Sequence, residues 1–311
     1  MPIATALAAA LLAAAPTAPP GPYLQGAVFT TPGMMVEGIA AGKPQGTIYA
    51  SDLYGMRLVK RTPEGRELAV PVPPNLGIVT ILGLKLSDNG MRLWACAQRR
   101  GEANKRTAAL IEADPKTLRV INVHNFPKSD SSALCNDLDF DGRAIILTES
   151  EGGKVWRFER RRFIRLGANM PMEYPNGIAV DRTNRIAFVA HSKGIARIDM
   201  WTGEATPLVL PAGQSAAGID GLYYKRRTLY GVQNVLDPMR VVRIDLDWER
   251  RKGVLHVLAG PDPRLPLPTT AAFVGRELWL VADAQFLKLD DNGKLKSGQA
   301  VAPTRLMRLP F

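Results

Sequence analysis

Short apolar runs separated by turn residues recur along the chain from about residue 33 to residue 290. A first run is followed by a second apolar run that ends in a polar residue, and in most cases by a third. The first runs read VEGIAA, ILGLKL, CNDLDF, PNGIAV, IDGLYY and TTAAFV. Turn sequences such as TPEG, SDNG and DDNG separate the runs. Because no amphipathic helix follows the first residues, this pattern predicts an all-β protein.

The first runs also recur at a regular distance. The steps between their anchor residues are 45, 54, 40, 44 and 51 residues, the anchors being Gly38, Gly83, Asp137, Gly177, Gly221 and Ala272. Repeats of this length with about four strands each are typical of propeller blades. We therefore predict a six-bladed β-propeller over residues 21–311. YLQGAVFTT and TRLMRLP are both candidates for the strand that closes the ring, and the sequence does not choose between them.

A polar residue precedes most of the anchors. The six residues at this position are Glu37, Leu82, Asn136, Asn176, Asp220 and Ala271. Since the first strand of each propeller blade lines the central channel, residues at one register converge on the axis. Four side chains that carry oxygen would meet there. The alternative is that Asn, Asp and Gly begin these strands only as turn residues.

The chemistry of these four residues predicts a metal site. Two carboxylates, Glu37 and Asp220, would repel each other in a confined channel, and burial would add to the cost. A divalent cation would cancel both charges. With amides as the other donors and no Cys or His, the set favours Ca²⁺ over Mg²⁺, and Mn²⁺ and Zn²⁺ are further alternatives. Water or a substrate oxygen would complete the ~6–8 ligands that Ca²⁺ prefers.

The basic charge of the chain does not indicate nucleic-acid binding. The net charge is +11, with clusters such as QRRGEANKR, RFERRRFIR, YKRRTLY and DWERRKG. Each cluster falls where a turn or an outer strand is expected, and the clusters are scattered rather than gathered with aromatic residues. We interpret them as a solvated basic surface that attracts anionic substrates or an anionic envelope surface. We expect a small-molecule substrate, no nucleic-acid partner and a monomer.

The N-terminal residues predict export. MPIATALAAALLAAAPTAPPGP contains an apolar run too short to span a bilayer, then small residues and a Pro-rich linker. We predict a signal peptide and linker over residues 1–20, and a periplasmic or secreted protein. A frayed Ala-rich helix and a wrongly assigned start codon are the alternatives, because the segment lacks Lys and Arg. No later segment is apolar for ~18 residues, so no membrane span is expected.

The chain has two cysteines, Cys96 and Cys135. Two cysteines do not make a disulfide framework, and sequence alone cannot place them within bonding distance. We expect two separate buried thiols and leave a disulfide between them as the alternative.

The chain resembles the regucalcin/gluconolactonase family, six-bladed propellers related to diisopropylfluorophosphatase and paraoxonase. VEGIA, CNDLDFDGRAIILTES, YPNGIAVD and GIDGLYY carry the resemblance. It implies a channel metal, usually calcium, held by Glu37, Asn176 and Asp220, with Asn136 on the metal or the substrate. Only His124, His191 and His256 are present, so a pair of histidines of the paraoxonase kind is not apparent.

The resemblance implies metal-dependent hydrolysis of a lactone or similar ester, as in gluconolactonases. Asp220 would act as general base, and Asn136 would orient metal and substrate. Polar residues that end the second runs form a possible outer ring of the site: Asp52, Gln98, Glu149, His191, Asn234 and Asp283. One alternative is a binding propeller without catalysis, in which the metal stabilises the channel. A condensing enzyme similar to strictosidine synthase is disfavoured by the oxygen donors.

Overall fold

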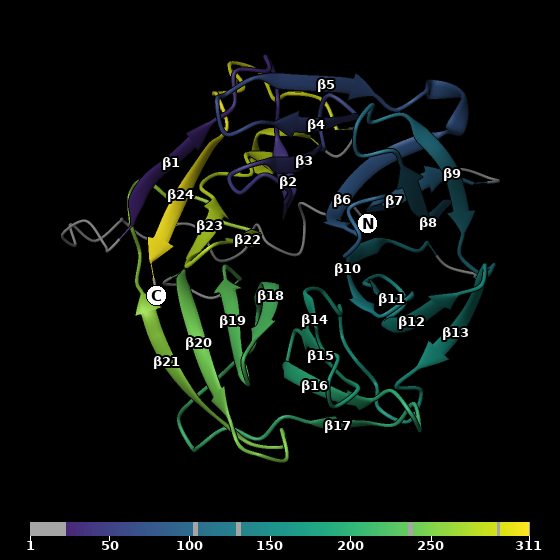
Figure 1. Ribbon diagram of the computed structural model, residues 1–311, viewed down its shortest axis with the longest axis vertical. Coiled ribbons are helices and arrows are strands. Elements are labelled where there is room, and N and C mark those ends of the chain that lie inside the picture. The colour runs from purple at the N-terminus through teal and green to yellow at the C-terminus, as the bar shows by residue number, and fades with distance from the viewer. Residues whose placement is uncertain (1–22, 102–104, 129–131, 236–238, 291–292, 311) are drawn as a thin grey trace.

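The computed structural model describes residues 23–310 except 102–104, 129–131, 236–238 and 291–292. Six four-stranded antiparallel sheets surround a central axis (Figure 1). The fold is the six-bladed β-propeller that the repeats predict. The predicted signal peptide and linker, residues 1–20, lie outside the described residues. Within the described part of the chain, no helix is long and apolar enough to cross a membrane.

Five blades are built from consecutive strands, with the innermost strand first. The first blade holds β2 (Val36–Ala41), β3 (Ile48–Asp52), β4 (Arg57–Arg61) and β5 (Glu67–Pro71). The second holds β6 (Ile78–Leu86), β7 (Leu93–Arg100), β8 (Arg106–Ala113) and β9 (Val120–Asn125). The third holds β10 (Cys135–Asp141), β11 (Ala144–Glu149), β12 (Lys154–Glu159) and β13 (Arg162–Leu166). The fourth holds β14 (Ile178–Asp181), β15 (Ile186–His191), β16 (Gly194–Asp199) and β17 (Ala205–Pro207). The fifth holds β18 (Ile219–Lys225), β19 (Thr228–Gln233), β20 (Arg240–Leu246) and β21 (Gly253–Ala259).

The last blade joins the two ends of the described chain. Its strands run from β22 (Ala271–Val274) and β23 (Glu277–Val281) to β24 (Arg305–Pro310) and β1 (Leu24–Val28). β1 pairs antiparallel with β24, and Leu24 lies opposite Arg308. Both segments that the sequence offers for closure are therefore used, one as the third strand and the other as the outermost. Two short 3-10 helices, η1 (Pro74–Leu76) and η3 (Phe286–Lys288), lie in the connections.

The core of the protein lies between neighbouring blades. Six apolar clusters each combine residues from two adjacent sheets. Successive residues of a strand point to opposite faces of the sheet. In β18, Leu222 therefore packs toward the fourth blade, while Tyr223 packs toward the last blade. This alternation explains why the innermost strands are apolar on both faces and why they are held rigidly around the channel.

The expectation of two separate thiols is wrong. Cys96 on β7 and Cys135 on β10 form a disulfide with an S–S distance of 2.00 Å. Both residues are fully buried in the cluster between the second and third blades. The packing of these blades brings together two cysteines that are 39 residues apart in sequence, and the sequence alone could not show that contact.

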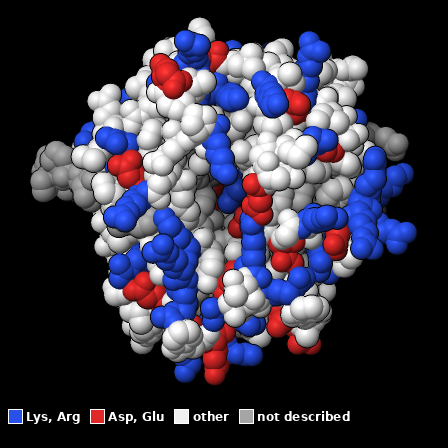
Figure 2. Space-filling model, viewed as in Figure 1, with Lys and Arg blue, Asp and Glu red and all other residues white. Residues whose placement is uncertain are grey.

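Basic side chains are spread over the surface. Figure 2 shows Lys and Arg across the rim and the middle of the face that it presents, with Asp and Glu between them. Two of the three histidines, His124 and His256, lie on the outermost strands β9 and β21, away from the channel. The polar chemistry of the channel therefore comes from other residue types.

Candidate metal centre

The innermost strands of four blades carry an irregularity in register at the same place. The shifts lie between Val36 and Ile39, Ile81 and Leu84, Cys135 and Leu138, and Ile219 and Leu222. In each case two residues of the innermost strand lie opposite one residue of the second strand, which is the pattern of a β-bulge. The first of the two is the channel residue that the repeats predict: Glu37, Leu82, Asn136 or Asp220. A bulge turns a side chain out of the regular alternation of the strand.

Side-chain hydroxyls stabilise two of these bulges. The Ser51 hydroxyl accepts a hydrogen bond from the backbone N–H of Gly38 at 2.9 Å. In the third blade the Thr148 hydroxyl accepts from the N–H of Asp137 at 3.0 Å and donates to the carbonyl of Asn176 at 2.7 Å. The bulges are therefore held by fixed contacts, and that of the third blade is tied to the start of the fourth.

Glycine follows several channel residues because the innermost strands approach one another closely there. A Cβ atom on Gly177 would lie 2.1 Å from the carbonyl oxygen of Asp220. A Cβ on Gly38 would lie 2.5 Å from the carbonyl oxygen of Leu82. Any larger residue would push two blades apart. In the fourth repeat, Asn176 is therefore the polar channel residue, and Gly177 leaves the space that the neighbouring fifth blade needs.

The structure corrects the predicted register of the sixth repeat. A Cβ on Gly221 would meet the carbonyl oxygen of Thr269 at 3.1 Å, as Gly177 meets Asp220. Val281 N also donates to Thr270 O, just as Ala190 N donates to Gly177 O, each at 2.9 Å. The sixth channel position is therefore Thr269 and not Ala271. The anchor of this repeat is Thr270 rather than a glycine, and the predicted alignment slipped by two residues.

Asp220 lies at the centre of a buried polar cluster. Asn234 Nδ2 donates to Asp220 Oδ2 at 2.6 Å, and the Asn176 side chain also hydrogen-bonds this carboxylate. Burial raises the pKa of Asp220 to about 7. The hydrogen bonds from Asn234 and Asn176 oppose this rise in pKa, and the negative charge of Asp137 adds to it.

Glu37 faces the same cluster from the first blade. Its Oε2 atom is buried and has no hydrogen-bond partner among the described residues. Burial raises the pKa of Glu37 well above its usual range, and the charges of Asp220 and Asp137 raise it further. The Glu37 backbone carbonyl accepts a hydrogen bond from Thr269 Oγ1 at 3.2 Å. A positive charge is the partner that this carboxylate lacks.

Asn136 lies at the equivalent bulge in the third blade and is also buried. Its Nδ2 donates to Ser150 Oγ at 2.9 Å, and Ser150 Oγ donates to the carbonyl of Pro175 at 2.6 Å. The amide nitrogen is therefore engaged, and Oδ1 is the atom that Asn136 can offer to a ligand. The structure brings Glu37, Asn176 and Asp220 together. Asn136 lies at the same register of its innermost strand, but among the described residues no direct hydrogen bond joins it to those three.

Two residues that the sequence analysis did not assign to the site also face it. Asp137, which takes the anchor position of the third repeat, has a buried carboxylate that accepts from Ile178 N at 3.1 Å. Burial raises its pKa to about 6. Tyr174 has a left-handed backbone with φ of 51°, and burial together with the charges of Asp220, Glu151 and Glu37 raises the pKa of its phenol. The only sequence signal for Tyr174 is its place two residues before Asn176.

Most of the polar residues that end the second strands have structural roles. Asp52 pairs with Arg57 at 2.6 Å and accepts from Met35 N at 3.1 Å. His191 Nδ1 accepts from Lys193 N at 3.3 Å, and burial lowers the His191 pKa. Within the described residues, only Asn234 of this proposed outer ring hydrogen-bonds the channel cluster. Such residues mainly satisfy backbone groups of loops, while Asn234 positions Asp220.

The channel cluster fits a hard cation. Two buried oxygens, Glu37 Oε2 and Asn234 Oδ1, lack a hydrogen-bond partner among the described residues. The amide oxygen Asn234 Oδ1 can only accept, and Glu37 Oε2 can only accept when the carboxyl is ionised; oxygen atoms of this kind suit Ca²⁺. The described residues contain no group of three or more His, Cys, Asp or Glu placed to hold a metal. Amide oxygens would therefore have to complete the coordination by the two carboxylates.

Fold and cluster together define a class: six-bladed propellers whose channel is lined by buried carboxylates and amides at one end. No family model matches the chain, and no curated protein sequence does. Several solved structures are similar to the chain in fold. A gluconolactonase from Xanthomonas campestris has 16% identity and a TM-score of 0.58, with 96% of this chain and 99% of that chain covered.

Two further structures have the same architecture. The calcium-binding protein regucalcin from Agrobacterium tumefaciens has 16% identity and a TM-score of 0.61, with 90% of each chain covered. Virginiamycin B lyase from Staphylococcus aureus has 17% identity and a TM-score of 0.58, with 84% of this chain and 81% of that chain covered. At these identities the likeness establishes the propeller fold, and the chemistry has to be argued from the residues.

Proposed function

We propose that this chain is a metal-dependent hydrolase of a lactone or similar ester, with Ca²⁺ as the metal. The observation that carries the proposal is the buried Glu37 Oε2, which has no partner among the described residues and faces a second buried carboxylate, Asp220. Two such carboxylates are costly to bury together unless a cation lies between them. The gluconolactonase and the calcium-binding regucalcin among the similar structures support the choice of substrate class and metal.

Glu37, Asn136, Asn176 and Asp220 would hold the cation through their oxygens. When bound, a divalent cation polarises a carbonyl oxygen and stabilises the negative charge that develops on it during ester hydrolysis. Glu37 acts as a ligand only. Asn136 and Asn176 orient the metal and the substrate without changing their protonation state.

Asp220 is the general base of the proposed reaction. Hydrogen bonds from Asn234 and Asn176 to its carboxylate favour the ionised form. They also fix the orientation of the side chain, so that an oxygen can accept a proton from a water molecule that attacks the ester carbonyl.

The test is a screen of lactones, aryl esters and phosphotriesters with added Ca²⁺, Mg²⁺, Mn²⁺ or Zn²⁺. We expect turnover of at least one lactone or carboxylic ester, its loss on addition of a chelator, and its return on addition of Ca²⁺. Hydrolysis that continues at full rate in excess chelator would contradict the metal dependence.

The second candidate is a binding propeller in which the metal only stabilises the channel. One observation favours it: Asn234 and Asn176 already hydrogen-bond the Asp220 carboxylate, which suits a ligand that never accepts a proton. Calcium binding by calorimetry together with no turnover of any substrate in the screen would support this candidate over the hydrolase.

We also propose that the protein is exported and works as a monomer on a small molecule. The disulfide between Cys96 and Cys135 supports an oxidising compartment, because the reducing cytosol seldom permits such a bond. Fractionation of cells that express the full chain should place the protein in the periplasm or the medium, with residues 1–20 removed. Recovery of the uncleaved chain from the cytosol would contradict export.

A further inference from the structure

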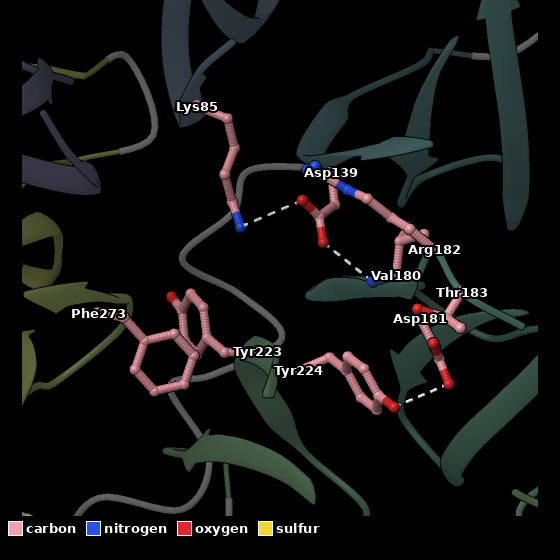
Figure 3. A pocket seen from close by; sticks show the side chains of 9 residues that line it. All are labelled: Lys85, Asp139, Val180, Asp181, Arg182, Thr183, Tyr223, Tyr224 and Phe273. Atoms are coloured by element: carbon pink, nitrogen blue, oxygen red, sulfur yellow. Dashed lines mark hydrogen bonds and ion pairs between the residues drawn. The ribbon is translucent and has the colours of Figure 1, made fainter. Parts of the chain in front are cut away.

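A cavity lies at the opposite end of the channel from Asp220. Its volume is about 340 Å³, and its walls include Lys85, Asp139 and Tyr223 (Figure 3). Asp139 and Tyr223 follow the channel residues Asn136 and Asp220 by three positions, which corresponds to about 10 Å along a strand. The cavity therefore opens toward the hairpins that join each innermost strand to the second strand of its blade.

Lys85 separates this cavity from the metal centre. Lys85 belongs to the second blade and Tyr223 to the fifth, and these blades lie on opposite sides of the ring (Figure 1). The Lys85 ammonium nevertheless lies 5.4 Å from the centre of the Tyr223 ring. The two side chains thus meet across the channel and narrow it. None of the four proposed metal ligands lines the cavity.

The carboxylates of the cavity are already engaged by the protein. Asp139 accepts hydrogen bonds from Phe140 N and Val180 N, each at 2.9 Å. Asp181 accepts from Tyr224 Oη at 2.7 Å and from Arg250 Nε at 2.6 Å. These bonds satisfy the acceptors and anchor the walls, so a cationic ligand would find little free carboxylate here.

Donors, in contrast, remain for a ligand. Lys85 Nζ lies 3.6 Å from Asp139 Oδ1, which is longer than a good hydrogen bond. Arg182 at the rim donates Nε to Phe140 O at 2.8 Å and pairs through Nη1 with Asp88, while Nη2 adds further donors. An ammonium and a guanidinium together suit a carboxylate or a similar anion.

Aromatic rings supply the apolar part of the cavity. Tyr223, Tyr224 and Phe273 line it, and Figure 3 shows the rings of Tyr223 and Phe273 side by side. Their centroids are 6.1 Å apart with an edge-to-face angle of 76°. Such rings favour a planar ring of a ligand by stacking or edge contacts. The cavity volume lies at the lower end of the range for small-molecule sites.

The charge of the surrounding hairpins points to the same kind of ligand. The six turns between first and second strands contain eight Lys or Arg and one Asp, over residues 42–47, 87–92, 142–143, 182–185, 226–227 and 275–276. Three of these eight basic side chains form ion pairs, with Glu112, Asp88 and Asp141. The other five basic side chains make no ion pair among the described residues. A ring of positive charge at a channel mouth raises the local concentration of anions.

We propose that this cavity is a second binding site, distinct from the metal centre, for a small anionic molecule that carries an aromatic ring. The anionic group contacts Lys85 and Arg182, and the ring lies among Tyr223, Tyr224 and Phe273. This site does not depend on hydrolysis at Asp220 and stands if the proposed function fails.

Calorimetry with the full chain and 2-naphthoate as the probe tests the proposal. Lys85→Met keeps the aliphatic stem and should weaken binding about tenfold, since a hydrogen bond to a charged group contributes on that scale. Arg182→Met, at the exposed rim, should weaken binding about threefold without affecting the fold. Arg165→Met, on the outer strand β13, is the matched control and should bind as the wild type does.

Ligand analogues and one channel variant complete the test. Neutral 2-naphthol and non-aromatic cyclohexanecarboxylate should both bind more weakly than 2-naphthoate, and Asp220→Asn should not change 2-naphthoate binding. Wild-type affinity for 2-naphthoate in both Lys85→Met and Arg182→Met would overturn the proposal. Loss of 2-naphthoate binding in Asp220→Asn would also overturn it. Binding of a heparin fragment without binding of 2-naphthoate would also overturn it, because the basic hairpins would then be a surface for polyanions.

Discussion

Asn234 Nδ2 donates a hydrogen bond of 2.6 Å to Asp220 Oδ2, and the same nitrogen donates to the carbonyl of Pro268 at 2.8 Å. The first bond lies within the fifth blade and holds the one channel carboxylate to which we assign a proton transfer. The second bond connects this blade to the segment that leads into the last blade.

Asn234→Leu tests this positioning role. The variant removes both bonds and nearly preserves the volume, so the pKa of Asp220 should rise and the acid limb of the pH–rate profile should move to higher pH by about one unit. The profile of kcat against pH for the best ester of the screen gives the measurement. Asn122→Leu is the matched control, because Asn122 makes a similar bond of 2.8 Å to Glu112 on the outer part of the second blade.

Asp220→Asn separates catalysis from folding. The amide has almost the same shape but cannot accept a proton from water, so kcat should fall by at least about a hundredfold. Circular dichroism and thermal melting should stay close to those of the wild type. Asp88→Asn, an exposed carboxylate at the other mouth, should leave kcat unchanged. Near-normal turnover by Asp220→Asn would remove this residue as the base.

The Glu37→Gln variant should be at least as stable as the wild type without calcium and less stable than the wild type with calcium. Without metal the variant lacks the repulsion between Glu37 and Asp220, so its melting temperature should equal or exceed that of the wild type. With Ca²⁺ at about 100 times the Kd, the wild type should gain about 2.7 kcal/mol while the variant gains much less. Melting curves of both proteins with chelator and with calcium make the comparison. Equal stabilisation of the two by calcium would contradict a ligand role for Glu37.

Calcium affinity should depend on pH. Burial raises the pKa of Asp220 to about 7 in the metal-free protein, so below this pH a proton competes with the cation. We expect the affinity to fall by about tenfold for each pH unit below 7. The metal-free protein should show the opposite trend and lose stability as the pH rises through about 7, because a carboxylate with a raised pKa favours folding only when it is protonated. Calorimetric titration and melting at several pH values measure both effects.

Reduction of the disulfide should destabilise the fold. Cys96 and Cys135 close a loop across 39 residues, and the chain-entropy model gives about 4 kcal/mol for a loop of this length. The Cys96→Ser/Cys135→Ser variant should therefore unfold at lower denaturant concentration than the wild type. Because Asn136 follows Cys135, this variant should also bind calcium more weakly than the wild type. An unchanged midpoint would show that packing alone holds the second and third blades together.

The sequence predicts the blades well because each blade repeats the same physical requirements. An innermost strand must be apolar on both faces, and its start must leave space for the neighbouring blade, which Gly38 and Gly177 provide. In the last repeat, where Thr270 takes the place of the glycine, the alignment fails even though the fold is unchanged. Side-chain convergence on the axis follows from the same register, so Glu37, Asn176 and Asp220 could be grouped before any coordinates were known.

Other features depend on contacts that no repeat encodes. The disulfide joins two blades, and its formation follows from their packing. Tyr174 reaches the site from a connecting loop, where its own backbone is left-handed; the equivalent position of the fifth repeat, Gly218, is also left-handed but has no side chain. The cavity beyond Lys85 arises because side chains from opposite blades meet across the channel. Such long-range contacts require the three-dimensional structure.

The pairing of β1 with β24 has a consequence for biosynthesis. Leu24–Val28 is made before the first five blades, whereas Arg305–Pro310 is made after them. These blades can assemble during translation, but the ring stays open until β24 has been made. Loss of Arg305–Pro310 would leave the edges of β1 and β23 exposed to other chains, and deletion of this one strand would then turn a closed molecule into one that aggregates.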